Sequence, residues 1–381
     1  MRADSLTGLR FIAAALVFLH HVIWFNVFAD QAVVDTYHAA FINAGRVGVT
    51  FFFILSGFVL TVAVRPNDTV AAFWRRRAAK IYPNHVVTAL LAMVVTTVVG
   101  SSALGWELIP NLLLVQTWWP SYDVVFSVNP VSWSLACELI FYLSFPFLYP
   151  LLAKVPERAL WWWVAGAAVG VVAVAAVAAA FLPASPPVPD GQPAGMYQFW
   201  FTYVFPPARL LDFVLGILMA RVVLSGRWPR LRPVGAVALC VAAYAVSMSV
   251  PYLFALNAVM VLPLALLVAS VAASDLAGRR SWLCSTPMLR LGECSYAFYM
   301  VHMLVMMLGT HLISGRVFSP LPAVGVLAGW FTVSLVCAWL LYTYVERPLT
   351  RLLGRGRTRR PSPGPEGGTP ARPVAHNIRQ R

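Results

Sequence analysis

Long apolar runs, separated by short polar stretches, occupy most of this chain. A helix needs about 20 apolar residues to cross the hydrocarbon core of a bilayer, and ten of the runs reach roughly that length. Inside a bilayer the backbone must satisfy its own hydrogen bonds, which a helix does within one segment. The pattern therefore predicts an all-α, polytopic integral membrane protein with about ten transmembrane helices, at 6–28, 45–64, 79–100, 131–153, 159–182, 200–224, 233–250, 254–273, 290–313 and 321–345.

Two further segments complete the organisation. The shorter apolar stretch 109–118 is expected to be re-entrant or interfacial, because it is too short to span. Residues 349–381 are basic and rich in Pro and Gly, which is typical of disorder. We therefore expect a membrane domain over 1–348 and a disordered cytoplasmic tail over 349–381. No cleavable signal peptide is expected, because Arg10 interrupts the first apolar run and no small-residue cleavage pattern follows.

Composition narrows the class and explains the charge. The chain is 60% hydrophobic and only 11% charged, which excludes an ordinary soluble domain. Its net charge of +14 would suggest a nucleic-acid partner, yet with a cytoplasmic N-terminus 24 of the 28 Lys and Arg residues fall on the cytoplasmic side of the spans. This asymmetry predicts a multi-pass protein of the cytoplasmic membrane, with both termini cytoplasmic and no nucleic-acid partner. The five scattered cysteines form no CxxC pair, so neither a disulfide framework nor a metal site is expected.

The first span, within 6–28, carries ionisable residues inside an apolar run. Arg10 and His21 are eleven residues apart, which is about three helical turns, so both side chains share one face roughly 16 Å apart. His20 is rotated by about 80° from that face. Ionisable groups within a span are functional candidates, because burying them in lipid is costly. The alternative is that Arg10 reaches the interface and His21 only packs.

The fourth span, 131–153, carries a second polar face. Ser134, Glu138 and Tyr142 recur every four residues and therefore point the same way. Glu138 and His21 each lie about 10 Å from the outer end of their spans, so the sequence permits a contact between them. A carboxylate beside an imidazole raises its basicity and fixes its tautomer. The alternative is a buried pair that serves packing specificity alone.

Other polar residues are candidates for ligand binding. A basic cluster just before the third span suits a phosphorylated ligand, since guanidinium groups grip phosphate; the alternative is lipid headgroup contact or plain positive-inside charge. In the sixth span, Arg209 and Asp212 are three residues apart, and a structural pair is favoured there. His302 is near mid-depth of the span 290–313. The basic cluster comprises Arg75, Arg76, Arg77 and Lys80.

Taken in order, these motifs resemble those of the membrane acyltransferase-3 family of O-acyltransferases. The resemblance runs from residue 6 to about residue 348, and its opening LTGLRF segment is also similar to the actinobacterial branch that acylates macrolides and their sugars. Two departures are that Lys80 stands where a second Arg is usual, and that Leu139 follows Glu138 where many relatives have Glu. The matching motifs are Arg-x10-His at Arg10 and His21, SGF at 56–58, RxxR at 77–80 followed by Pro83, WSLxxE at 133–138, R-x-x-E/D-F-x-x-G at 209–216 and LGxxSYxxYxxH at 291–302.

The resemblance implies transfer of an acyl group from acyl-CoA to a hydroxyl of a sugar, glycan or macrolide-type acceptor, without a permanently bound cofactor. His21 would be the general base, oriented by Glu138, with Arg10 meeting the donor lower in the cavity. The CoA phosphates would rest on the basic cluster at 75–80. Candidates for acceptor binding or for stabilising the oxyanion are Ser134, Tyr142, Arg209 and His302.

Two alternatives remain open from the residues. The acyl group could pass through transient acylation of His21 or Ser134 instead of direct transfer. A protein of another class, a transporter or channel, could use Arg10, His21 and Glu138 as a proton or substrate relay. Only the enzyme would release free CoA in a manner that depends on an acceptor.

Overall fold

The computed structural model describes residues 4–65, 68–100, 105–189, 191–279 and 281–354. Within these ranges every regular element is a helix, and the only β-type contacts are two isolated bridges. The all-α prediction is therefore confirmed. The helices are α1 (Asp4–His21), η1 (Val22–Phe25), α2 (Gln31–Phe41), α3 (Ala44–Val62), α4 (Val70–Val99), α5 (Leu108–Leu112), η2 (Gln116–Trp118), α6 (Tyr122–Val125), η3 (Pro130–Ser132), α7 (Trp133–Ala153), η4 (Glu157–Ala159), α8 (Leu160–Phe181), α9 (Met196–Phe199), η5 (Trp200–Val204), α10 (Pro206–Leu224), α11 (Pro233–Ser247), α12 (Tyr252–Ala255), α13 (Val261–Leu276), η6 (Trp282–Cys284), α14 (Thr286–Leu312), α15 (Pro320–Leu341), η7 (Tyr342–Glu346) and α16 (Arg347–Gly354).

Each of the ten predicted spans contains one of the longer helices. In the described part of the chain, 7 helical segments are long and apolar enough to cross a membrane, which confirms a polytopic membrane protein. The remaining three predicted spans correspond to α10, which carries Arg209, Asp212 and Arg221, and to the shorter apolar helices α11 and α13. The total number of spans stays a prediction.

Several boundaries differ from the predicted ones. α4 begins at Val70, ahead of the predicted start at 79, because Thr69 caps it by accepting a hydrogen bond from the Ala72 amide at 3.2 Å. The basic cluster is therefore helical. The stretch 109–118 forms parts of α5 and η2, and the chain remains helical through α16 to Gly354, within the predicted tail. The rest of that tail, 355–381, lies outside the described residues.

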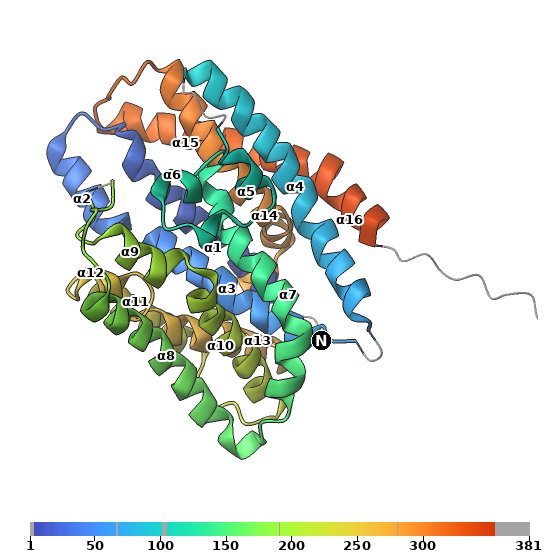
Figure 1. Ribbon diagram of the computed structural model, residues 1–381. Helices are drawn as coiled ribbons and strands as arrows, with labels where there is room; N and C mark the ends of the chain where they lie inside the picture. The colour runs from blue at the N-terminus through green and yellow to red at the C-terminus, as the bar shows by residue number, and fades with distance from the viewer. Residues whose placement is uncertain (1–3, 66–67, 101–104, 190, 280, 355–381) are drawn as a thin grey trace, which may run out of the picture.

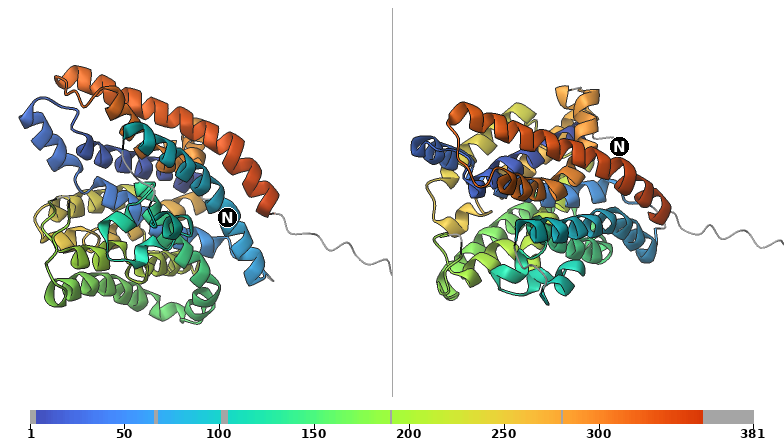
Figure 2. Two further views of the ribbon diagram at one scale, coloured as in Figure 1. Left: turned by 45° about the horizontal axis from the view of Figure 1, so that its top comes forward. Right: turned by 90° about the horizontal axis from the view of Figure 1, so that it is seen from above.

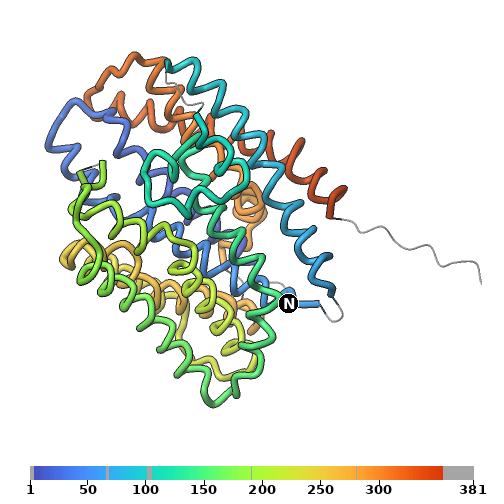
Figure 3. Tube along the Cα trace, viewed as in Figure 1, coloured from blue at the N-terminus to red at the C-terminus, as the bar shows by residue number. Residues whose placement is uncertain are grey.

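The helices form one bundle in which α1, α3, α10 and α14 are central. α3 packs most extensively on α10, and α1 packs on α14 and α3. Figures 1 and 2 show α4, α15 and α16 along one side of the bundle and α8 along the opposite side. Figure 3 shows that α5 and α6, in the stretch between α4 and α7, lie beside the start of α7.

Glycines permit the closest helix contacts in the centre. A Cβ atom at Gly57 would lie 2.0 Å from the Phe213 carbonyl oxygen, and one at Gly216 would lie 2.0 Å from the Ile54 oxygen. A Cβ at Gly48 would lie 2.6 Å from Val17 on α1. Small residues at such positions let helix backbones approach. These contacts fix α3 between α1 and α10.

Candidate active site

Two neighbouring cavities lie in the centre of the bundle. The first, here called the Arg10 pocket, has a volume of about 80 Å³ and is lined by Arg10, Lys80, Glu138 and Tyr142 among others. The second, the His21 cavity, has a volume of about 490 Å³ and is lined by His20, His21, Arg46 and many aromatic side chains. Val49 and Tyr299 line both cavities, so the two meet at these residues.

His21 is paired with a second histidine at the edge of the His21 cavity. Its Nδ1 lies 2.7 Å from Nε2 of His302 on α14, and the two rings are nearly coplanar, at 8°. His302 is fully buried, and its Nδ1 lies 3.2 Å from the Phe298 carbonyl oxygen. A carbonyl only accepts, so His302 Nδ1 carries a hydrogen.

This contact fixes the tautomers of both rings. With His302 neutral, its Nε2 is an acceptor, so Nδ1 of His21 must be the donor in the contact between them. A neutral His21 then has a free lone pair on Nε2. Catalytic sites in which a third group orients a general base contain a similar hydrogen bond.

The expected contact between His21 and Glu138 does not form. Glu138 lies in the Arg10 pocket, where Tyr142 Oη donates to its Oε2 at 3.4 Å. The prediction rested on equal depth in the membrane, but equal depth does not specify which helices lie next to each other. α1 packs on α14, whereas α7 packs on α10, α4 and α3, so α14 supplies the partner of His21.

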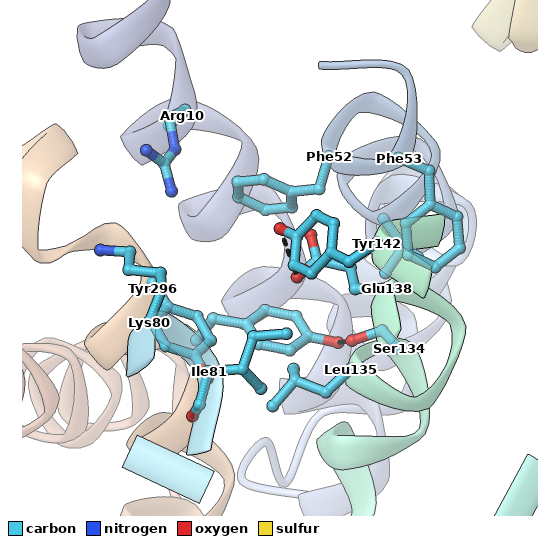
Figure 4. Close-up of a pocket in the computed structure, with 12 residues that line it drawn as sticks. Arg10, Phe52, Phe53, Lys80, Ile81, Ser134, Leu135, Glu138, Tyr142 and Tyr296 are labelled. Carbon is cyan, nitrogen blue, oxygen red and sulfur yellow. Dashed lines mark hydrogen bonds between the residues drawn. The ribbon is translucent and has the colours of Figure 1, made fainter. Parts of the chain in front are cut away.

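The Arg10 pocket combines cations with one carboxylate. Figure 4 shows Glu138 and Tyr142 on α7 across the pocket from Arg10 and Lys80. Nε of Arg10 is buried without a hydrogen-bond partner among the described residues. Lys80 also pairs with Glu346, a buried residue at the end of η7. Because one cation retains free donors, the pocket can hold a polar or anionic group of a ligand.

Comparison with known proteins identifies the family of the chain. The family model described as an acyltransferase domain matches residues 4–343. The chain belongs to this acyltransferase family. Acyltransferase MdmB of Streptomyces mycarofaciens is 42% identical to this acyltransferase over 377 residues, or 96% of each chain.

More distant relatives are similar over part of their length. The putative peptidoglycan O-acetyltransferase YrhL of Bacillus subtilis is 26% identical over 370 residues, which are 85% of this acyltransferase and 54% of that protein. A putative O-acetyltransferase of Staphylococcus aureus is 27% identical over 171 residues, 40% of this chain and 26% of the relative. No solved structure gives a significant match. The acyltransferase is thus a multi-pass membrane enzyme that transfers acyl groups.

The basic cluster of the acyltransferase divides by helix face. The guanidinium group of Arg77 lies 5.8 Å from the centre of the Tyr142 ring, near the Arg10 pocket that Lys80 lines. Arg76 pairs with Asp68, and Arg75 is exposed. Arg77 and Lys80 are three residues apart on one face of α4, whereas Arg75 points elsewhere.

The four remaining candidates have different surroundings. Ser134 contacts the Tyr299 hydroxyl at 2.8 Å beside the Arg10 pocket, and Tyr142 lines the same pocket. Arg209 lines neither cavity, because it is fully buried and paired with Asp212 at 3.1 Å, as the sequence favoured. His302 is the partner of His21, a role that its position near mid-depth did not predict.

Sequence reasoning missed Arg46 as a site residue. It lies near the start of α3 and lines the His21 cavity. A signal was present in the charge distribution, because Arg46 is one of only four cations outside the predicted cytoplasmic segments. A cation that the positive-inside rule does not explain needs another reason for its position.

Proposed function

We propose that this acyltransferase is a membrane O-acyltransferase that moves an acyl group from acyl-CoA to a hydroxyl of a sugar, glycan or macrolide-type acceptor. The observation that carries the proposal is the His21–His302 pair at the edge of a large cavity that adjoins a cation-lined pocket. Acyl transfer to a hydroxyl needs a base for the hydroxyl proton and a route for the donor, and these two features supply both.

His21 acts as the general base in this proposal. Its Nδ1–H is held by His302, so its Nε2 lone pair is available to take the acceptor proton. His302 touches no substrate and is a positioning residue, held in turn by the Phe298 carbonyl. Arg10 and Glu138 would act in the adjoining pocket, on the arm of the donor.

The donor enters from the side of the basic cluster. CoA phosphates would meet Arg77 and Lys80, since charge-assisted bonds to phosphate are strong. The flexible arm would then run through the Arg10 pocket and past Val49 and Tyr299, which line both cavities. Its thioester would thus reach the cavity that His21 lines.

The acceptor occupies the His21 cavity. A volume of about 490 Å³ falls in the range of small-molecule sites, about 300–1,000 Å³. Aromatic side chains with polar tips suit the apolar faces and hydroxyls of sugars and macrolides. They include Trp24, Tyr122, Trp133, Tyr203, Tyr252 and Tyr299.

Acceptor-dependent release of CoA tests this function. The purified full-length protein would be given acetyl-CoA with and without a hydroxylated macrolide or a glycan, and free thiol would be measured. We expect release only when an acceptor is present, with an acylated product of the corresponding mass. Acetyl-CoA left intact across a broad panel of acceptors, together with transport in vesicles, would instead favour the relay class.

A further inference from the structure

Arg46 is a buried cation without a carboxylate partner. Its exposed fraction is 8%, and no described Asp or Glu side chain forms an ion pair with it. Its guanidinium donates to the side-chain oxygens of Asn43 and Gln192, and it lies 4.8 Å from the centre of the Tyr252 ring. These neutral groups orient the guanidinium, and among the described residues none supplies a negative charge paired with it.

The other buried arginine in the described residues differs in this respect. Arg209 has Asp212 at 3.1 Å, and neither residue is exposed. Burying a cation is costly, and a paired anion offsets part of that cost for Arg209, whereas no described anion does so for Arg46. The cavity that Arg46 lines contains no described Asp or Glu side chain. A negative charge that appears in this cavity would be stabilised by Arg46.

Helix packing places Arg46 at the depth of His21. A Cβ at Gly45 would lie 2.4 Å from the His20 ring, and one at Gly48 would lie 2.6 Å from Val17. These two contacts set the register of α3 against α1. Arg46 follows Gly45, and His21 follows His20, so both belong to the same level of the bundle and line the same cavity.

Arg46 also lies next to the point where the two cavities meet. Val49, which lines both of them, is one turn further along α3 and on the same face. A donor arm that passes Val49 therefore brings its thioester toward Arg46. The candidates expected from sequence are less well placed, since Arg209 is paired with Asp212 and Tyr142 bonds to Glu138 in the other pocket.

We propose that Arg46 is a catalytic residue that binds the oxyanion formed during acyl transfer, an inference that rests on the proposed function. The acceptor hydroxyl gives its proton to Nε2 of His21 as its oxygen bonds to the thioester carbon, and the carbonyl electron pair moves onto oxygen. Arg46 donates hydrogen bonds to that oxyanion. When the carbonyl re-forms, the C–S bond breaks and His21 returns the proton to sulfur, releasing CoA as the thiol.

The experiment separates oxyanion binding from ground-state binding. Arg46→Gln should lower kcat by about 10²–10³-fold, the range for losing an oxyanion donor, while KM for acetyl-CoA and for the macrolide acceptor stays within a few fold. A trifluoromethyl ketone analogue of acetyl-CoA forms an oxyanion when the acceptor hydroxyl adds to its carbonyl carbon. This analogue should inhibit the wild type strongly and the variant weakly. An unchanged kcat, or a raised acceptor KM with kcat retained, would overturn the proposal.

A second variant keeps Arg46 in place. Gln192→Glu puts a carboxylate where Gln192 accepts from Arg46, so it should neutralise the guanidinium and also lower kcat. If Arg46→Gln does not fold, Gln192→Glu tests the proposal in its place, and wild-type turnover in Gln192→Glu would refute the assignment.

Arg316→Gln, at an exposed loop cation between α14 and α15, is the matched control and should be fully active. If the wild-type protein shows no acceptor-dependent CoA release, the proposed function and this inference both fail. If the wild type is active and Arg46→Gln and Gln192→Glu are equally active, only the inference fails.

Discussion

His21 and His302 are 281 positions apart in the chain, yet two of their ring nitrogens lie 2.7 Å apart. His20, next to His21, has other contacts. Its Nδ1 lies 3.1 Å from the Phe41 carbonyl oxygen, and its ring packs on Gly45. The two adjacent imidazoles therefore have different partners, because helical rotation turns them about 100° apart.

The histidines provide the first prediction. His21→Ala should lower kcat by about 10²–10⁴-fold, the usual range for losing a general base. His302→Leu should lower kcat less, since it leaves the base but removes the acceptor that fixes its tautomer. His302→Gln keeps an acceptor oxygen and should restore part of the lost activity, with KM unchanged in all three. Steady-state kinetics on folded protein would measure this.

The matched control is His20→Asn, which retains a donor for the Phe41 carbonyl. It should keep kcat within a few fold of the wild type. A protein that is inactive after losing His20 yet active after losing His21 would contradict the assignment of the base.

A second prediction concerns donor binding by the basic cluster. Neutralising Arg75, Arg76 and Arg77 together should raise KM for acetyl-CoA, and most of the effect should come from Arg77, which lies beside Tyr142. Arg77→Gln should raise KM by about 10–100-fold, because a charge-assisted bond contributes roughly 1.5–3 kcal/mol. Arg75→Gln, at an exposed position of the same helix, should leave KM unchanged. Equal effects of the two single substitutions would indicate a general charge effect instead.

At the scale of elements, α3 is central to the site because it packs on two helices and also lines both cavities. Gly48 packs on α1, Gly57 packs on α10, and Arg46 and Val49 face the cavities. The contact between α3 and α10 is the most extensive in the bundle. A displacement of α3 would therefore change the site as well as the packing.

The third prediction tests this contact through stability. Gly216→Ala should lower the melting temperature of the detergent-solubilised protein, because the added Cβ would lie 2.0 Å from the Ile54 carbonyl oxygen. Overpacking of this kind costs about 1–3 kcal/mol. Gly166→Ala on α8 has no neighbouring atom within 4 Å of the added Cβ and should be neutral or slightly stabilising. Equal melting temperatures for the two variants would argue against close packing of α3 on α10.

At the scale of the whole molecule, alternate loops gather at the two ends of the bundle. The segments expected in the cytoplasm contact one another at one end, and the segments expected outside contact one another at the other end. The first set includes Ser5 with Asp275, Arg227 with Glu157, and Thr350 with Ala79. The second includes Ala29 with Phe318, Asn43 with Ser247, and Trp200 with Thr117. This sorting supports the proposed topology, in which the basic end is cytoplasmic.

The fourth prediction addresses that orientation. A cysteine placed at Val70, in protein whose reactive native cysteines are replaced, should react with a membrane-impermeant reagent only after the cells are opened. A cysteine at Arg316 should react in intact cells, because its loop belongs to the opposite end. The reverse labelling pattern would mean that the basic end faces outward and that the donor route must be reversed.

The sequence by itself determined the membrane class, the helices and the family. These depend on local properties: the length of apolar runs, the hydrogen bonds that a backbone in lipid must satisfy, and short motifs such as Arg10 with His21. It also determined relations within one helix, such as the Arg209–Asp212 pair, because three residues of separation fix a common face.

Only the tertiary structure decided which faces meet. Glu138 and His21 were expected to touch because their depths agree, but α14 lies beside α1 at that level and His302 takes the place of Glu138. Arg46 became a site residue only when Gly45 and Gly48 set α3 against α1. Lateral packing of helices depends on the shapes of many side chains distant in sequence, and neither hydrophobic periodicity nor depth specifies it.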